Sequence, residues 1–236
     1  MKYLQTEALL EGNECSNDAI PSEQAVKLHL DELQEQIDAL PADAPADERL
    51  QLTLDRGYGL LEINAFEDAW NIAREAFDQA IENEQWLRAV EACDIMFQSD
   101  QPESLKALAQ GIWLGVTFPI DPELSVAMLQ HLVDESVDRS DGAAVAAATA
   151  CYLVDLRAEG KQREDLEFFT MQLLGQVARK HSQVEEQEIF DFWMEQLELK
   201  EPAKFLPRLA QVLDVISNND WWYDRDVLRS KIPDEA

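Results

Sequence analysis

The residues of this chain with the widest chemical repertoire are its three histidines, His29, His131 and His181. None belongs to an H-E-x-x-H motif, and none follows a glutamate by three residues, so the helical zinc-protease and carboxylate di-iron patterns are missing. Pairs of carboxylates can transfer protons to a substrate, but a chain with 48 acidic residues contains such pairs by chance. The sequence therefore predicts no catalytic residue and no metal site.

Glycine and cysteine patterns argue against a bound cofactor. Gly57 and Gly59 lack the third glycine of a dinucleotide-binding turn, and the chain has no G-x-x-x-x-G-K-[ST] loop for phosphates. The cysteines, Cys15, Cys93 and Cys151, are odd in number and far apart, which fits neither a zinc ribbon nor a disulfide framework. We therefore expect no cofactor and a reducing, cytoplasmic compartment.

Acidic residues dominate the composition. The 48 Asp and Glu residues against 19 Lys and Arg residues give a formal net charge of -29, which repels nucleic acid, anionic lipid and phosphorylated substrates. We expect a basic protein partner and no direct binding to nucleic acid. A plainer interpretation is that the acids keep the protein soluble or adapt it to a salty cytoplasm. The acidic cluster 185–191 is explained by a solvated helix face, a basic partner or a divalent cation.

Neither membrane insertion nor secretion is expected. No stretch approaches the roughly 20 consecutive apolar residues of a membrane span. The amino-terminal stretch is interrupted by Glu7 and Glu11, so it lacks the apolar core of a signal peptide.

Apolar residues recur at helical spacing through most of the chain, and its 8 glycines are few. The first clear helix spans residues 22–40, ends at Pro41 and is followed by an acidic Pro/Ala linker. We therefore predict an amino-terminal arm, residues 1–46, and a helical-repeat domain, residues 47–236. The helix of the arm is expected to pack on its own domain, and the alternative is that it docks on another subunit. Helices of this domain are predicted at 48–63, 66–82, 85–98, 102–116, 122–137, 142–157, 163–181, 183–198, 202–217 and 220–230.

Two of these helices have recognisable start signals. Asp121 precedes Pro122 and is placed to cap the helix predicted there. Ser182 with Glu185 forms a capping-box pattern, in which each residue satisfies a free backbone amide of the other.

Taken in pairs, the predicted helices form hairpins that start about 34 to 42 residues apart, which is the spacing of helical solenoids. Residues 56–80 resemble the tetratricopeptide-repeat (TPR) family. Small Gly57 and Ala69 stand where that family brings two helices close together, and the surrounding apolar frame is Leu60, Phe66, Ala73 and Ala76.

The chain also departs from the TPR pattern. Trp86, Ala89, Cys93 and Met96 repeat part of the frame only 20 residues later, whereas the period of the family is 34 residues. Thr53 and Arg56 replace large apolar residues, and Ile81 stands where a closing proline is common. The resemblance implies an all-α, TPR-like α-solenoid with a concave surface that binds peptides or proteins.

Candidate partner-binding residues come from two places. Residues 221–223 are adjacent large aromatics that, on the predicted helix, point about 100° apart, so one buried face cannot take all three. They lie in the near-neutral stretch 200–236, which has 7 acidic and 6 basic residues. The plainer interpretation is a terminal helix that caps the open end of the solenoid. The candidates, including two on the TPR-like helix, are Trp221, Trp222, Tyr223, Arg225, Tyr58 and Arg56.

These features favour an intracellular interaction module, an adaptor or assembly chaperone that binds a basic or partly folded protein. Two alternatives stay open. An acidic nucleic-acid mimic that occupies a DNA- or RNA-binding protein needs carboxylates at the spacing of phosphates. A helical metalloprotein or enzyme needs a buried polar pocket that no motif reveals.

Overall fold

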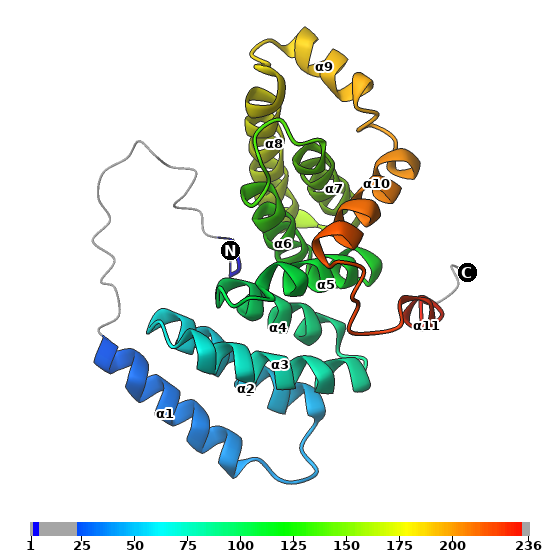
Figure 1. The fold of residues 1–236 in the computed structure, drawn as a ribbon. Helices are drawn as coiled ribbons and strands as arrows, with labels where there is room; N and C mark the ends of the chain where they lie inside the picture. Colours follow the sequence, from blue (N-terminus) through cyan, green and yellow to red (C-terminus); the bar gives the residue numbers. More distant parts are fainter. Residues whose placement is uncertain (1, 5–22, 233–236) are drawn as a thin grey trace. The chain divides into compact units, whose positions relative to one another are not determined.

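The computed structural model describes residues 2–4 and 23–232, and this part of the chain forms eleven α-helices and no strand (Figure 1). The prediction of an all-α fold is confirmed, and each predicted helix overlaps an observed one. The helices are α1 (Glu23–Ala39), α2 (Ala46–Glu62), α3 (Phe66–Glu82), α4 (Trp86–Gln98), α5 (Ser104–Thr117), α6 (Pro122–Asp134), α7 (Asp141–Arg157), α8 (Gly160–Ser182), α9 (Gln187–Gln196), α10 (Pro202–Ile216) and α11 (Arg225–Arg229).

Contacts group the chain into two compact units. The first unit, Tyr3–Ala107, contains α1 to α4 and the first turn of α5. The second unit, Leu108–Ala236 with the first two residues of the chain, contains the rest of α5 and α6 to α11. Inside the first unit α1 packs against α2. The division between an arm and a repeat domain at residues 46 and 47 stays a prediction.

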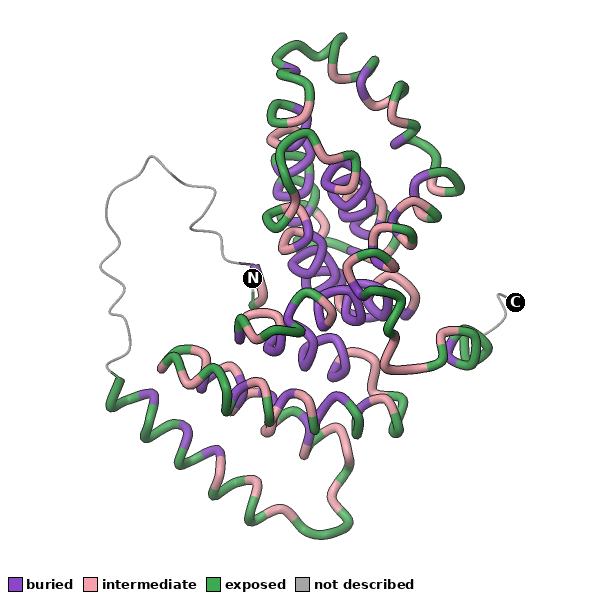
Figure 2. Tube along the Cα trace, viewed as in Figure 1, coloured by how far each residue is buried: buried purple, intermediate pink, exposed green. Residues whose placement is uncertain are grey.

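Small side chains on α3 bring the helices of the first unit together. Ala69, Ala73, Ala76 and Ala80 recur at spacings of four and three, so they share one face of the helix, and each is at most 1% exposed. α3 packs extensively against both α2 and α4. The core of this unit therefore follows α3, and buried positions alternate with exposed ones along its ribbon (Figure 2).

Gly57 allows α2 to approach α4. A Cβ atom at Gly57 would lie 3.0 Å from Cδ1 of Ile95, and its three nearest neighbours all belong to that isoleucine. The sequence pattern pairs Gly57 with Ala69 of α3, but the closest side chain comes from α4. Gly59 serves the contact with α1 in the same way, because a Cβ there would lie 2.8 Å from Cδ2 of Leu30.

The 20-residue recurrence in the sequence corresponds to one helix and its turn. The helices α3 and α4 each begin two residues after a left-handed residue, Asn64 with φ 58° and Glu84 with φ 57°. In both turns the next amide donates a hydrogen bond of 2.9 Å to the carbonyl five residues earlier. α2 and α3 have the same length and are followed by the same kind of turn. The two sets of apolar residues therefore begin at equivalent positions of α3 and α4.

The central helix of the second unit is α7, which packs against α6, α8 and α10. Its alanine-rich residues 143–150 are each at most 7% exposed. Because the side chains are small on every side of α7, several neighbouring helices can pack closely against it. α9 has few contacts with α8, and α10 turns back to α7, so the serial packing of α6, α7 and α8 does not continue through α9.

Asp121 caps α6 as predicted. Its carboxylate accepts a hydrogen bond of 2.9 Å from the amide of Glu123, and Pro122 is the first residue of the helix. Pro122 has no amide hydrogen that would need a partner there.

The capping box predicted from Ser182 and Glu185 is wrong. Ser182 is the last residue of α8, and Gln183 adopts the left-handed conformation with φ 56°. The amide of Gln183 bonds back to α8, and Val184 is buried in the turn. α9 therefore begins only at Gln187.

The three adjacent aromatics Trp221–Tyr223 lie before a helix rather than on one. Asn218 and Asn219 both have φ 54°, which turns the chain after α10. Asp224 caps α11 by accepting hydrogen bonds from two of its amides, so this helix begins at Arg225. The predicted helical start at residue 220 is wrong, and so is the argument that placed the three rings about 100° apart.

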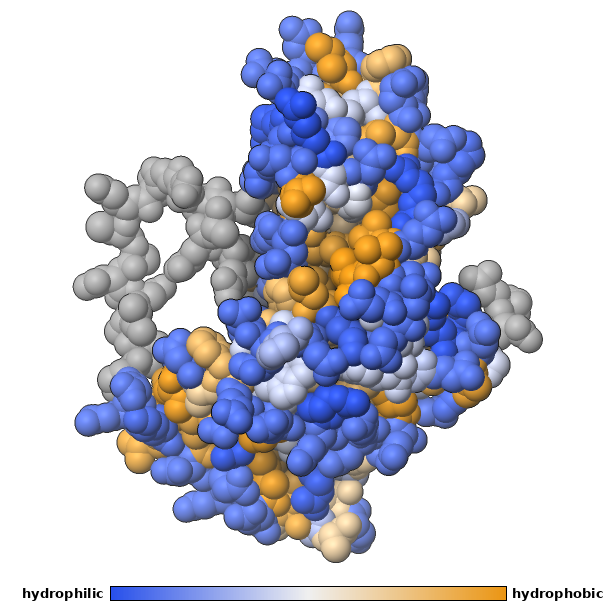
Figure 3. Space-filling model, in the orientation of Figure 1, coloured by the Kyte–Doolittle hydropathy of each residue, from blue (hydrophilic) through white to orange (hydrophobic). Residues whose placement is uncertain are grey.

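Hydrophilic side chains dominate the face drawn in Figure 3, where apolar side chains gather in separate patches. Among the residues that the structure describes, no helix is both long and apolar enough to span a bilayer.

Candidate functional site

Trp113 of α5 is the centre of an aromatic cluster in the second unit. Its ring centroid lies 5.3 Å from that of Tyr223 and 6.4 Å from those of Trp221 and Phe118. The rings of Trp221 and Tyr223 are 6.0 Å apart. Tilted aromatic pairs at these distances are favourable beyond the area that they bury. Two of the predicted partner-binding aromatics thus cover Trp113, which is only 4% exposed.

Polar contacts anchor the same segment to α5. The Tyr223 hydroxyl donates a hydrogen bond of 2.9 Å to the carbonyl of Gln110, a fully buried residue. The Gln110 side chain donates to the carbonyl of Asp220 at 3.2 Å and accepts from the amide of Trp222 at 3.3 Å. A glutamine inside an apolar helix is therefore used to hold the backbone of the aromatic segment.

Arg225 completes this arrangement. Its guanidinium carbon lies 4.1 Å from the Trp221 ring centroid, and its Nη1 donates to Asp214 at 2.9 Å. Asp214 also accepts a hydrogen bond of 3.1 Å from the indole of Trp221. The structure brings the four predicted residues of this region together, all of them half-buried. Their role in partner binding stays a prediction.

Carboxylates are buried between α2 and α4 in the first unit. Glu91 and Asp94 of α4 are 1% and 2% exposed, and the Tyr58 hydroxyl donates a hydrogen bond of 2.9 Å to Asp94. Burial raises the pKa of Tyr58 well above its ordinary value, and the negative charges of Asp94 and Glu91 act in the same direction. Tyr58 is therefore a neutral hydrogen-bond donor in this cluster.

Arg88 is the cation of the same cluster. It donates hydrogen bonds to Asp47 at 2.7 Å, to Glu91 at 2.9 Å and to Gln51 at 3.1 Å. The hydrogen bond from Arg88 lowers the pKa of Asp47. The hydroxyl of Tyr3 also donates to Glu91. Each buried charge is thus hydrogen-bonded, which offsets much of its desolvation cost.

Arg56, the other predicted residue on α2, does not join Tyr58. Residues two apart on a helix do not face each other. Arg56 is half-buried, and its Nε is buried without a hydrogen-bond partner.

Sequence reasoning missed the charged residues of α4. Arg88, Glu91 and Asp94 recur every three residues in a helix that is otherwise apolar as far as Phe97. Three charges at this spacing form one polar stripe. A polar stripe on a helix whose other faces are apolar was the signal for a buried ionic cluster.

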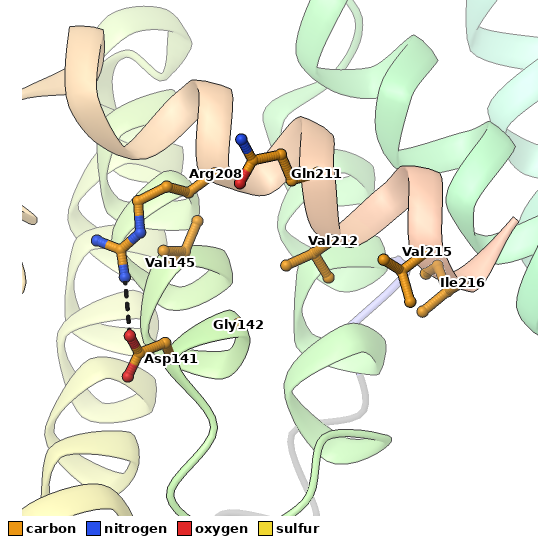
Figure 4. Close-up of a pocket in the computed structure, with 8 residues that line it drawn as sticks. All are labelled: Asp141, Gly142, Val145, Arg208, Gln211, Val212, Val215 and Ile216. Atoms are coloured by element: carbon orange, nitrogen blue, oxygen red, sulfur yellow. Dashed lines mark hydrogen bonds and ion pairs between the residues drawn. The ribbon is translucent and has the colours of Figure 1, made fainter. Parts of the chain in front are cut away.

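An open, mainly apolar groove lies between α7 and α10 in the second unit (Figure 4). Its volume is about 330 Å³, at the lower end of the range for ligand sites. Gly142 allows α7 and α10 to lie close together, because a Cβ atom there would lie 3.3 Å from Cγ2 of Val212. The lining residues are Asp141, Gly142, Val145, Arg208, Gln211, Val212, Val215 and Ile216, which we call the α7–α10 groove.

The two ends of the α7–α10 groove differ. At one end Arg208 donates a hydrogen bond of 3.2 Å to Asp141, so the charges there are paired. Towards the other end the lining is aliphatic, and Val215 is 73% exposed. This lining suits apolar side chains of a polypeptide better than a small charged metabolite.

Asp141 also belongs to a Ser–His–Asp arrangement. Nε2 of His181 is 3.0 Å from Asp141, and Nδ1 is 2.6 Å from Oγ of Ser182 and 3.2 Å from the indole nitrogen of Trp193. Ser182 is the last residue of α8, where the free backbone groups are carbonyl oxygens. Carbonyl oxygens repel the oxyanion that acyl transfer must stabilise. We therefore interpret these contacts as structural, because the hydrogen bond from Trp193 to His181 holds α9 against α8.

The two cysteines that the structure describes differ in burial. Cys93 is buried and Cys151 half-buried, and burial raises the pKa of both thiols, which disfavours the nucleophilic thiolate. Cys15 lies outside the described residues. Within them, no three His, Cys, Asp or Glu residues are placed to hold a metal ion.

Comparison with known proteins finds no family model, no curated protein and no solved structure that matches this chain. The TPR resemblance therefore stays a prediction, and the geometry of the sites carries the functional argument.

Proposed function

We propose that the chain is a protein-interaction module that holds an apolar segment of a partner protein in the α7–α10 groove. The observation that supports this is the groove itself, where Val212, Val215 and Ile216 form an aliphatic lining that is partly open to solvent, above the buried Val145. An apolar segment that enters it gains roughly 25 cal/mol for each Å² of apolar surface removed from water.

The charge of the chain limits the kind of partner. A formal charge of -29 favours encounter with basic proteins and opposes approach by nucleic acid. Exposed charge pairs contribute little binding energy each, so the apolar contact is expected to supply most of the affinity. We infer an adaptor or assembly chaperone of the cytoplasm that binds a basic or partly folded protein.

We also propose that the helices belong to a TPR-like series. The support is serial packing, in which α2, α3 and α4 contact one another in the first unit, as α6, α7 and α8 do in the second. In such a series each helical hairpin buries its apolar face on the next and leaves another face for a ligand.

Site-specific photocrosslinking in the native host tests the proposal. A photoreactive amino acid replaces Val215 in the groove, and the matched control replaces Val227 on α11, which is 52% exposed. We expect basic proteins to crosslink at position 215 and not at 227. A second variant, Val215→Asp, puts a charge on the aliphatic lining and should no longer retain the proteins that crosslink at position 215. Equal crosslinking at both positions, or none at 215, would count against the groove as the partner site.

A further inference from the structure

A second groove, lined by both polar and apolar residues, lies in the second unit, where α8 ends and α9 begins. It has a volume of about 210 Å³. Trp193 fixes its α9 wall, because this side chain is 5% exposed and its indole donates to His181 at the end of α8. The groove is lined by Met171, Gly175, Arg179, Val184, Glu185, Glu186, Gln187 and Phe190, which we call the α8–α9 groove.

An exposed apolar row on α8 continues the α8–α9 groove. Phe168, Met171 and Gly175 are spaced three and four residues apart, so they lie on one face of the helix. Phe168 is 69% exposed and Met171 is 54% exposed. Between Phe168 and Gly175 the helix rises about 10 Å, which matches two turns of a second helix. Large side chains exposed beside a groove are typical of a surface that binds another molecule.

Acidic side chains surround the turn and α9. Residues 183–199 contain six Asp and Glu residues and no Lys or Arg. Lys200 forms an ion pair with Glu195 at the end of α9, and Lys204 forms one with Glu198 just after it. Glu185 and Glu186, which line the groove, have no ion-pair partner within the described part of the chain. The groove therefore combines apolar side chains, among them Met171 and Phe190, with carboxylates that are free to meet a cation, beside the guanidinium of Arg179.

We propose that the α8–α9 groove binds a cationic amphipathic helix of another protein. The apolar stripe of that helix would pack on Met171 and Phe168, and its Lys or Arg residues would meet Glu185 and Glu186. A second copy of this chain is disfavoured because both copies carry a charge of -29. An anionic membrane surface is disfavoured for the same reason. The inference rests on the proposed function for its partner class but uses a different surface from the α7–α10 groove.

Gly175 provides a way to block the groove without disturbing the core. A Cβ atom there would meet only Nη1 of Arg179, at 3.7 Å, which is an ordinary contact. The side chain of Gly175→Leu would therefore project into the groove and exclude a ligand. Loss of binding in this variant reports on the groove, provided that its thermal unfolding remains cooperative.

The probe is a fluorescent synthetic helix of leucine and lysine residues with one apolar face, and the control is the same peptide with glutamate in place of lysine. Fluorescence anisotropy of the full chain with each peptide gives the affinity at low and at high salt. We expect binding of the lysine peptide alone, weakened by salt. We expect Gly175→Leu to weaken it about tenfold or more, a loss of about 1.4 kcal/mol.

Two charge variants distinguish binding at the α8–α9 groove from a general attraction to the negative charge of the chain. One variant combines Glu185→Gln with Glu186→Gln, and the control combines Asp31→Asn with Glu35→Gln on α1, which removes the same charge from exposed positions. We expect only the first to weaken binding severalfold. Equal weakening by both, or full affinity in Gly175→Leu, would overturn the proposal.

Two further arms keep the test decisive. Phe168→Ser changes an exposed residue and should also weaken the peptide, so it replaces Gly175→Leu if that variant fails to fold. Crosslinking at Val215 reads a separate groove, so its result does not depend on the peptide. A positive result at Val215 with no peptide binding would reject the α8–α9 groove and leave the proposed function standing.

Discussion

The hydroxyl of Tyr58 on α2 donates a hydrogen bond of 2.9 Å to the carboxylate of Asp94 on α4, a side chain that is 2% exposed. The same carboxylate oxygen of Asp94 accepts a second hydrogen bond of 2.9 Å from Gln98. Tyr58→Phe keeps the ring and removes one of these donors. We expect the free energy of unfolding in urea to fall by about 1–3 kcal/mol, because a buried acceptor loses a partner. Unchanged stability would mean that water replaces the phenol at no cost.

The raised pKa of Tyr58 predicts a loss of stability at alkaline pH. The unfolded chain releases the phenolic proton near pH 10, whereas the folded chain retains it to higher pH. The stabilisation is therefore complete below about pH 10 and is lost as the pH rises through the folded pKa. Urea midpoints of wild type and Tyr58→Phe, measured from neutral to alkaline pH, should converge above about pH 10. Parallel curves would contradict this linkage.

Removal of Arg88 should be more damaging. Arg88→Met leaves Glu91, which is 1% exposed, without its guanidinium. We expect a loss of about 3–5 kcal/mol in the free energy of unfolding. The double variant Arg88→Met with Glu91→Leu should recover part of that loss, because it removes the buried carboxylate that has lost its guanidinium. A double variant no better than the single one would show that burial of the carboxylate is not the cause.

Helix positions were readable from the sequence because they depend on local periodicity. The range predicted for α3 coincides with Phe66–Glu82, since alanines at spacings of four and three mark its buried face. The end of α8 was predicted wrongly because Ser182 and Glu185 match the pattern of a capping box, whereas the left-handed residue that ends the helix is a glutamine and not the usual glycine or asparagine. In the structure Gln183 closes α8 and moves the start of α9.

The candidate sites could not be predicted from the sequence, because they depend on which helices pack against each other. Tyr58 and Asp94 are 36 residues apart, and the α7–α10 groove joins residues 141–145 to residues 208–216. Periodicity identifies the apolar face of α10 but does not identify α7 as its neighbour. The aromatic segment was recognised as unusual, whereas its contact with Trp113 depends on a turn at Asn218 and Asn219 that the helical interpretation omitted.

Two glycine variants should have opposite effects. Gly175→Ala adds a methyl group where the surroundings are open, and alanine favours a helix, so we expect a gain of about 0.5–1 kcal/mol. Gly57→Ala should lose about 1–3 kcal/mol, because its Cβ would lie 3.0 Å from Ile95. Thermal and urea unfolding of both variants measure the difference. A gain in Gly57→Ala would mean that Ile95 can move aside.

Trp221→Ala separates a structural role of the aromatic segment from a role in binding. The substitution removes the ring that contacts Trp113 and lies under Arg225. Since Trp221 is only half-buried, we expect a loss of about 2 kcal/mol in the free energy of unfolding, less than the 3–5 kcal/mol of a fully buried tryptophan. Near-ultraviolet circular dichroism should change as well, because the cluster of coupled rings around Trp113 loses one member. Arg225→Ala, the matched variant, should lose less than Trp221→Ala. Trp221→Ala could instead unfold like wild type and no longer retain the partners crosslinked at Val215. That outcome would show that the segment acts mainly in binding, which is the role predicted from the sequence.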